Sequence, residues 1–361
     1  MRSSAAPIGD RGVAIDPFSS PSDGGAHVLL DSLHARAVAA AGDRAAEFAL
    51  ARELARGAGG RSAGAAFDLL ATLAAADATL ARVVEPHLDA VGILAECPEP
   101  VDLDAVAAGG PSTWGVFAAE APGMRLEARE TDGGWLLSGT KPWCSLADEL
   151  SHALVTAHTP SGRRLFAVAM QQAGVTAHPE LWAARGLPTV PSGPVDFDGV
   201  PAVAVGAEGW YLRRPGFERG GVGVAACWFG GAVGLARRAR AAARLRPDDD
   251  IAAMHLGRIG AALLSARSVL AHAARSFDAS DHGDPGRDLA LLAQLTRSVV
   301  RRECELVLRE CGHLLGPAPY ATESEVAARA ADLELYLRQD HAERDEARAG
   351  RMLAAAGEDE R

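Results

Sequence analysis

The chain has 361 residues, of which 48% are hydrophobic and 23% are charged, and its formal net charge is −11. Length and composition predict a globular protein of two or three domains with a large core. The acidic balance argues against nucleic-acid binding, which needs a basic face, and no apolar run reaches the roughly 20 residues of a membrane-spanning helix. The N-terminus lacks a basic-then-apolar signal segment, so we expect a cytoplasmic protein.

Histidine and cysteine form no pattern typical of metal binding. The eleven histidines show neither His-x-x-x-His nor His-Glu-x-x-His spacing, and no two of the five cysteines form a Cys-x-x-Cys pair. We therefore expect no metal site, and we expect the thiols to be reduced and mostly involved in packing.

The first quarter of the chain is typical of helices. Residues 1–25 are rich in Ser, Pro, Gly and Asp, which predicts a flexible N-terminal arm. For residues 26–112 we expect an α-helical N-terminal domain with four or five short helices. Its apolar residues recur at three- and four-residue intervals, as in Leu70, Leu73, Ala76 and Leu80. We expect His34 and His87 to lie at the surface or at helix ends.

Short alternating segments separated by turn residues follow between residues 113 and 209. Their spacing predicts an all-β middle domain, a small barrel or sandwich. The expected strands are Trp114–Phe117, Trp135–Leu137, His152–Ala157, Arg164–Ala169, Gly174–His178, Gly193–Phe197 and Ala202–Val205. We expect a turn at Ser138-Gly139.

Helical periodicity returns at residue 210 and continues to residue 361. The expected helices are Gly220–Leu245, Ile251–Phe277, Asp288–Leu315 and Glu323–Ala356. Turns are expected at Asp278–Arg287 and Gly316–Tyr320. Four long helices with short connections predict an antiparallel four-helix bundle. Glycines at 230, 231 and 234 predict that the first of these helices approaches another helix closely.

One stretch of the β region carries residues suited to a flat ligand. Trp143 follows a short apolar strand, and Ser145 comes two positions later. An indole can cover the face of a flat ring, while a hydroxyl and nearby backbone amides meet the polar edge of the ring. We therefore expect a slot beside these two residues, closed on its other side by the bundle. The alternative is that Trp143 is only a core aromatic of a β-sheet.

These motifs and the order of the three regions resemble the acyl-CoA dehydrogenases, which combine a helical domain, a β-barrel and a C-terminal four-helix bundle. Gly139–Ser145 is similar to the family's Gly-x-Lys-x-Trp-Ile-Thr segment, and Glu120 lies in a segment similar to its Thr-Glu-Pro. Asp196–Pro201 resembles the family's Phe-x-x-Val-x-Val-Pro strand, and Gly230–Arg238 resembles its helix after the β-domain.

The resemblance implies an FAD-dependent oxidoreductase that oxidises the α,β-carbons of an acyl-CoA. In that reaction a base removes the α-proton, donors hold the enolate oxygen, and the flavin takes the β-hydride. It also implies a homodimer or homotetramer with FAD at a subunit interface, bound in part by Trp143, Ser145 and Glu120. It identifies neither the substrate nor the electron acceptor.

The family's catalytic base is the main departure. Its C-terminal glutamate pattern places Ala327 where the catalytic Glu is expected, and a methyl group cannot take a proton. Glu323 and Glu325 are close in sequence, but two positions on a helix turn a side chain by about 200°. Some family members carry their base before an Arg at the start of the first bundle helix, and Glu218 precedes an Arg there. Glu218 is the candidate base; the alternative is that it only stabilises the helix start.

Other departures concern the cofactor. His313 stands where a Gln of the family meets the adenosine half of FAD, and Arg244–Asp250 replaces its Arg-x-x-Phe-Gly segment. Three aspartates there make a poor phosphate site, so FAD binding is altered or partly lost. Arg338 and Gln339 are candidate ligands of a phosphate or carboxylate. The alternative is that Arg338 pairs with Glu334, and Asp340 with Arg344, on an exposed helix.

Three hypotheses follow. The first is a dehydrogenase-type flavoenzyme acting on an acyl thioester or a related carbonyl-activated substrate. The second is a flavin-dependent monooxygenase on the same fold, which does not need the glutamate missing at Ala327. The third is a non-catalytic, degenerate paralogue that acts as a scaffold or as the partner of an active subunit.

Overall fold

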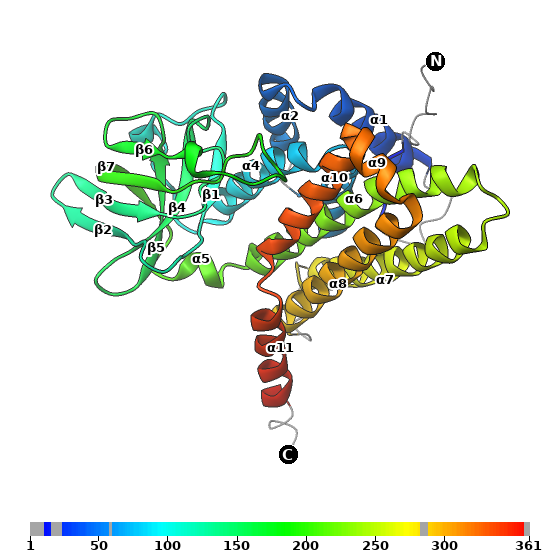
Figure 1. Ribbon diagram of the computed structural model, residues 1–361. Coiled ribbons are helices and arrows are strands. Elements are labelled where there is room, and N and C mark those ends of the chain that lie inside the picture. The colour runs from blue at the N-terminus through cyan, green and yellow to red at the C-terminus, as the bar shows by residue number, and fades with distance from the viewer. Residues whose placement is uncertain (1–10, 16–23, 58–59, 282–287, 357–361) are drawn as a thin grey trace.

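The computed structural model describes residues 11–15, 24–57, 60–281 and 288–356. Most of the expected N-terminal arm and part of the expected turn Asp278–Arg287 lie outside these residues. Within them, N-terminal helices, a central β-barrel and C-terminal helices follow one another, as expected (Figure 1). None of the described helices is long and apolar enough to cross a membrane.

Four helices form the described N-terminal region: α1 (Gly24–Ala40), α2 (Arg44–Arg56), α3 (Ala63–Ala76) and α4 (Ala78–Glu96). Three of them begin at a side chain that accepts a hydrogen bond from the first turn, namely Asp43, Ser62 and Asp77. Asp77 ends α3 and also begins α4, so these two helices join without a loop.

Two expectations about this region are wrong. Residues 11–15 are not a loose arm, because the Val13 amide donates to Thr72 Oγ1 at 2.9 Å and Val13 and Ile15 are buried. His34 and His87 are buried in the middle of α1 and α4, so they lie neither at the surface nor at helix ends. His87 Nδ1 accepts a hydrogen bond from the Trp114 amide at 3.2 Å, which ties α4 to the first strand. Burial lowers the pKa of His87 to about 4, so the ring is neutral and can accept.

The strands are β1 (Trp114–Phe117), β2 (Leu126–Thr131), β3 (Gly134–Lys141), β4 (His152–His158), β5 (Arg163–Ala169), β6 (Val175–Ala177) and β7 (Val195–Val205). They pair in the order β1-β4-β2-β3-β7-β5, β4 also pairs with β5, and β6 pairs with β7. The β4–β5 pairing closes the sheet into a barrel. Short 3-10 helices lie at Asp104–Val106 and Pro179–Leu181.

Three details of the barrel differ from expectation. β2 was not expected, because charged residues alternate along it with the buried Leu126 and Ala128. The two strands expected around Gly199 are one continuous strand, β7. Ser138-Gly139 is not a turn: β3 continues through it with a bulge, and Gly139 has a φ of +115°.

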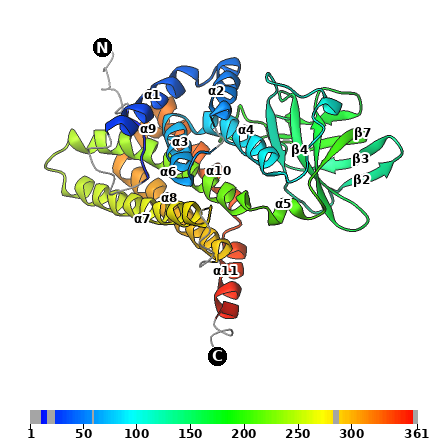
Figure 2. The ribbon, with the colours of Figure 1, turned by 180° about the vertical axis from the view of Figure 1, so that it is seen from behind.

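The C-terminal region contains α5 (Trp210–Arg213), α6 (Gly216–Arg244), α7 (Asp250–Asp281), α8 (Leu289–Leu315), α9 (Pro317–Thr322), α10 (Ser324–Tyr336), a 3-10 turn (Leu337–Gln339) and α11 (Glu343–Ala356). The long helices α6, α7 and α8 pack on one another, and α10 lies against α6. The expected helix Glu323–Ala356 is in fact two helices, and α11 projects away from the body (Figures 1 and 2). Part of the expected turn Gly316–Tyr320 is the short helix α9.

The N-terminal and C-terminal helices share one hydrophobic core. α3 packs along α6, and the largest buried side chain, Trp228, lies on α6. Gly230 makes the close approach expected from the sequence, since a Cβ built there would lie 2.2 Å from the Ala71 carbonyl oxygen of α3. A methyl group at this position would force the two helices apart.

We therefore expect Gly230→Ala to lower the free energy of unfolding by about 1–3 kcal/mol or more. Gly257→Ala on α7 is the matched control, because nothing lies within 4 Å of a Cβ built there. In that exposed helical position alanine should stabilise the protein by up to about 1 kcal/mol. Urea unfolding of both variants checks the prediction, and equal effects of the two substitutions would contradict it.

Candidate active site at Ser145, Arg82 and Glu85

Trp143 stands in a strained and exposed position just after β3. Its φ is +60°, which is rare for a bulky residue, and its relative exposure is 59%. Two hydrogen bonds fix the backbone that follows it: the Cys144 amide donates to the Gly193 carbonyl at 2.9 Å and the Leu146 amide to that of Pro191 at 2.8 Å. Strain of this kind clusters at ligand sites. The alternative that Trp143 is a core aromatic is therefore wrong.

Ser145 points inward and meets a charged side chain from the helical region. Its Oγ accepts a hydrogen bond from Arg82 Nη2 at 3.0 Å and lies 2.7 Å from Ser192 Oγ. Arg82 belongs to α4, and its guanidinium also lies over the ring of Tyr336 at the end of α10, 5.6 Å from the centroid. The barrel, α4 and α10 therefore meet at one guanidinium.

Arg82 also changes the shape of the site. We expected an open slot between Ser145 and the bundle, but the enclosed space lined by Arg82, Trp114, Phe117 and Ser145 is only about 10 Å³. That is about the space of one water molecule. A ring-sized ligand can bind here only where Trp143 is open to solvent, or after Arg82 has moved.

A larger cavity lies next to this contact, on the other side of α4. It has a volume of about 170 Å³ and is lined by α3, α4 and the start of α6. Its polar wall includes Glu85, Asp89, Glu96 and Arg214. Arg214 binds Asp89 at 3.0 Å and Glu96 at 2.8 Å, so these two carboxylates already have a partner in the wall.

Glu85 lines the cavity and pairs with Arg82, which in turn binds Ser145. Its Oε2 lies 3.0 Å from Arg82 Nη1, one helical turn away on α4, and the residue is only 8% exposed. Burial raises the pKa of Glu85 to about 7, against the favourable charge of Arg82 and with a further increase from Asp89. A carboxyl group with this pKa can both accept and release a proton near neutral pH.

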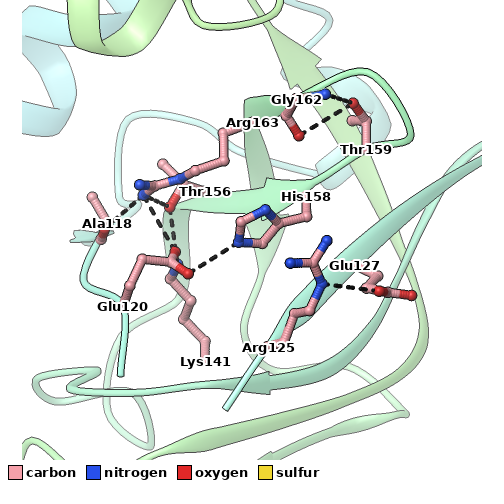
Figure 3. Close-up of polar contacts among 10 residues, drawn as sticks. All are labelled: Ala118, Glu120, Arg125, Glu127, Lys141, Thr156, His158, Thr159, Gly162 and Arg163. Atoms are coloured by element: carbon pink, nitrogen blue, oxygen red, sulfur yellow. Dashed lines mark hydrogen bonds and ion pairs between the residues drawn. The ribbon is translucent and has the colours of Figure 1, made fainter. Parts of the chain in front are cut away.

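Glu120 is exposed just after β1 and belongs to a separate polar cluster on the barrel (Figure 3). Its carboxylate binds Lys141 Nζ at 2.8 Å, His158 Nε2 at 3.0 Å and Arg163 Nη2 at 3.3 Å. Burial alone would raise the pKa of Glu120, but the hydrogen bonds from Lys141 and His158 lower it overall. The contacts of Glu120 are thus those of an exposed counter-ion for the buried Lys141, and its expected role at a cofactor stays a prediction.

The carboxylates near Ala327 do not face Ser145. Ala327 is half-buried on α10, Glu323 makes two hydrogen bonds to Arg238 of α6 at 2.8 and 2.6 Å, and Glu325 pairs with Arg329 at 3.0 Å. Glu218 is half-buried at the start of α6 but is not among the residues lining the cavity. Burial raises the pKa of Glu218, opposed by Arg348 and Arg297.

The remaining expected contacts are dispersed. His313 is exposed near the end of α8, next to His255 of α7. Arg338 and Gln339 are exposed on the 3-10 turn after α10, where Arg338 pairs with Glu305 of α8 at 3.1 Å rather than with Glu334. The structure thus brings Ser145 together with Arg82 and Glu85, and leaves His313, Arg338 and Gln339 elsewhere.

Sequence reasoning missed Arg82 and Glu85. The signal was available, because Arg82 interrupts the apolar run Leu80–Val84 of α4 and Glu85 ends it, three residues after Arg82. Charged residues on the apolar face of a helix need partners when buried. The sequence could not show that one of those partners is Ser145, which lies on another element.

No known family's sequence profile and no curated protein matches the chain. Solved structures match its fold. KijD3, solved with FMN and dTDP-3-amino-2,3,6-trideoxy-4-keto-3-methyl-D-glucose, gives a TM-score of 0.76 at 20% identity, over 97% of this chain and 96% of that one. Dibenzothiophene monooxygenase (TdsC) from Paenibacillus sp. A11-2 gives a TM-score of 0.69 at 19% identity, over 90% of this chain and 94% of that one. Glutaryl-CoA dehydrogenase from Mycobacterium smegmatis gives a TM-score of 0.66 at 22% identity, over 85% of this chain and 89% of that one.

The chain has the acyl-CoA dehydrogenase fold. This confirms the three-part architecture inferred from the sequence. Proteins described as a monooxygenase and as a dehydrogenase both have the acyl-CoA dehydrogenase fold, so the fold alone does not decide the reaction.

Proposed function

We propose that the protein is a flavin-dependent oxidoreductase of the monooxygenase type that acts on a small polar substrate. One observation carries the proposal. Glu85 is a buried carboxyl group with a pKa of about 7 that lines a cavity and is joined to Ser145 by a single arginine. Perturbed carboxyl groups in cavities are typical of proton-transferring residues.

The residues at Ser145 fit the polar edge of a flavin. Arg82 offers N–H donors, Ser145 and Ser192 offer hydroxyls, and Trp143 offers an exposed ring face. These four residues would hold the cofactor. FMN fits better than the expected FAD, because the segment that replaces the family's Arg-x-x-Phe-Gly carries three aspartates, Asp248–Asp250, which make a poor phosphate site. KijD3, which has a similar fold, was solved with FMN.

When bound, a reduced flavin supplies the two electrons with which O₂ gives one oxygen atom to the substrate and one to water. The chain's own groups act on the substrate. The polar wall of the cavity orients it, the Arg82 guanidinium holds Glu85 in place, and Glu85 Oε takes a proton from the substrate. The cavity has a volume of only about 170 Å³, and its charged side chains are set in a lining that is otherwise mostly apolar, so it suits a small molecule with one polar group better than a long acyl chain.

Alanine at 327 favours oxygen transfer over the α,β-oxidation of an acyl-CoA, since the glutamate expected on α10 is replaced by a methyl group. Oxygen uptake with chemically reduced FMN and a panel of polar substrates tests the proposal. Anaerobic reduction of the flavin by acyl-CoA substrates would instead support dehydrogenation. A protein that binds neither FMN nor FAD would support the non-catalytic paralogue. The expected homodimer or homotetramer is tested by light scattering.

We expect Ser145→Ala to weaken FMN binding about tenfold, because one hydrogen bond of the slot is lost. Ser268→Ala on α7 is the matched control, since its Oγ only donates to the Leu264 carbonyl of its own helix. Fluorescence titration with FMN and with FAD gives both dissociation constants. If wild type binds flavin and Ser145→Ala binds it equally well, the flavin lies elsewhere.

A further inference from the structure

Two histidines and a buried glutamate come together between α7 and α8, far along the chain from Ser145. His255 belongs to α7, and Glu310 and His313 lie one turn apart on α8. His255 Nδ1 lies 2.7 Å from Glu310 Oε2, and one ligand atom from each of the three residues can be chosen so that all lie within 4.8 Å of one another. The proposed oxidoreductase chemistry uses none of the three residues.

The donor types are those of a transition-metal site. Two imidazoles and one carboxylate are typical ligands of Zn²⁺, and three protein ligands leave one position for water. Ligand atoms around a tetrahedral ion at about 2.1 Å lie about 3.4 Å apart. The 2.7 Å contact between His255 Nδ1 and Glu310 Oε2 would therefore have to widen, while separations of up to 4.8 Å need a small closure. His313 is exposed and can turn to make it.

Arg309 and Arg258 lie beside Glu310, and their positive charges oppose the binding of a metal ion there. Arg309 Nε lies 3.2 Å from Glu310 Oε1, and Arg258 Nη1 lies 3.5 Å from Oε2. Both side chains are more than half exposed, at 63% and 54%. The arginine side of each pair is exposed to solvent although Glu310 is buried, so both guanidiniums can swing into solvent and leave the carboxylate to a metal ion.

We propose that His255, Glu310 and His313 form a Zn²⁺-type site that ties α7 to α8. The site needs ligands from two helices, which is why no spacing within one stretch of sequence indicated it. Its position between the helices predicts that the bound ion stabilises the helical region, since any ligand that binds only the folded state raises the unfolding temperature.

The test uses the untagged full chain, freed of metal with a chelator and titrated with ZnCl₂ by calorimetry and with CoCl₂ by visible absorption. We expect one ion per chain and a higher unfolding temperature. His313→Ala removes an exposed ligand without disturbing the core, and should weaken binding at least about tenfold. His341→Ala is the matched control, because His341 also lies beside a carboxylate, Asp345, at 3.6 Å.

The arginines provide a second and independent readout. Arg258→Ala removes a competing cation, so it should tighten Zn²⁺ binding, whereas ordinary surface binding would not respond to it. Equal affinities in wild type and His313→Ala, or no uptake by wild type, would overturn the proposal. Flavin binding is measured on the same samples, so that failure of the metal site is not confused with failure of the oxidoreductase proposal.

Discussion

Glu85→Gln is expected to lower the turnover number by about 100- to 10,000-fold, the usual contribution of a general base. Glutamine keeps the size of the side chain and can still accept a hydrogen bond from Arg82, but it cannot take a proton. Flavin binding should therefore change little. Turnover and flavin affinity, measured on the same preparation, separate a chemical role from a structural one.

The control is Glu47→Gln. Glu47 is also a buried glutamate paired with an arginine three residues away, Arg44 of α2, and burial raises its pKa as well. It lies outside the cavity, so turnover should stay near that of wild type. Equal losses in the two variants would show that Glu85 matters only for packing.

The pH dependence gives a second test of Glu85. As a base it must be deprotonated, so the wild-type rate should rise with pH through about 7 and then level off. The charged groups acting on it are Arg82 and Asp89 of α4 and Arg297 of α8. The folded pKa lies above the ordinary value of 4.5, so the folded state holds the extra proton between these values. Stability should therefore fall as pH rises from about 4.5 to 7, and Glu85→Gln should remove that slope.

Arg301→Ala should lower the free energy of unfolding by about 3–5 kcal/mol, because it removes one partner of a buried ion pair. Arg301 Nε lies 3.1 Å from Asp340 Oδ1, and the Asp340 side chain is fully buried. The same guanidinium binds Glu305 at 2.8 Å and Glu346 at 2.7 Å. Without it, Asp340 keeps the Ala342 amide at 2.9 Å and the more distant Arg297, at 3.7 Å.

Arg302→Ala is the control, since Arg302 is the next residue, is 60% exposed and lies 3.9 Å from Glu346. It should cost less than about 1 kcal/mol. Unfolding in guanidinium chloride at pH 5 and at pH 8 gives the free energy of unfolding of both variants. The loss in Arg301→Ala should be larger at pH 8, because burial raises the pKa of Asp340 and a proton can neutralise it in acid. A loss as small as that of Arg302→Ala would contradict the buried pair.

The same pair explains why the single helix predicted over Glu323–Ala356 is in fact two helices. Its periodicity is helical throughout, but Asp340 is drawn into the core by Arg301 of α8, and the chain leaves the helix between α10 and α11. That interaction joins distant residues and overrides local propensity. The strand Trp114–Phe117, by contrast, agrees with expectation residue for residue, because its turn signals and apolar run are local.

The candidate site likewise combines residues that a local motif indicates with residues that only the tertiary structure brings together. Trp143 and Ser145 could be found from a motif, because they lie within three residues of each other. Arg82 and Glu85 belong to a helix that precedes them by about sixty residues, and their role depends on how α4 crosses the end of β3. Glu85 also shows its altered pKa only once its burial is known.

Helix α4 connects the barrel to the C-terminal helices. Its His87 is bonded to the barrel at Trp114, and its Arg82 reaches both Ser145 of the barrel region and Tyr336 of α10. These two parts cannot swing apart as rigid bodies without breaking these contacts. A ligand that binds at the exposed ring of Trp143 leaves these contacts intact, whereas one that reaches further in must displace Arg82, the side chain that joins the two parts.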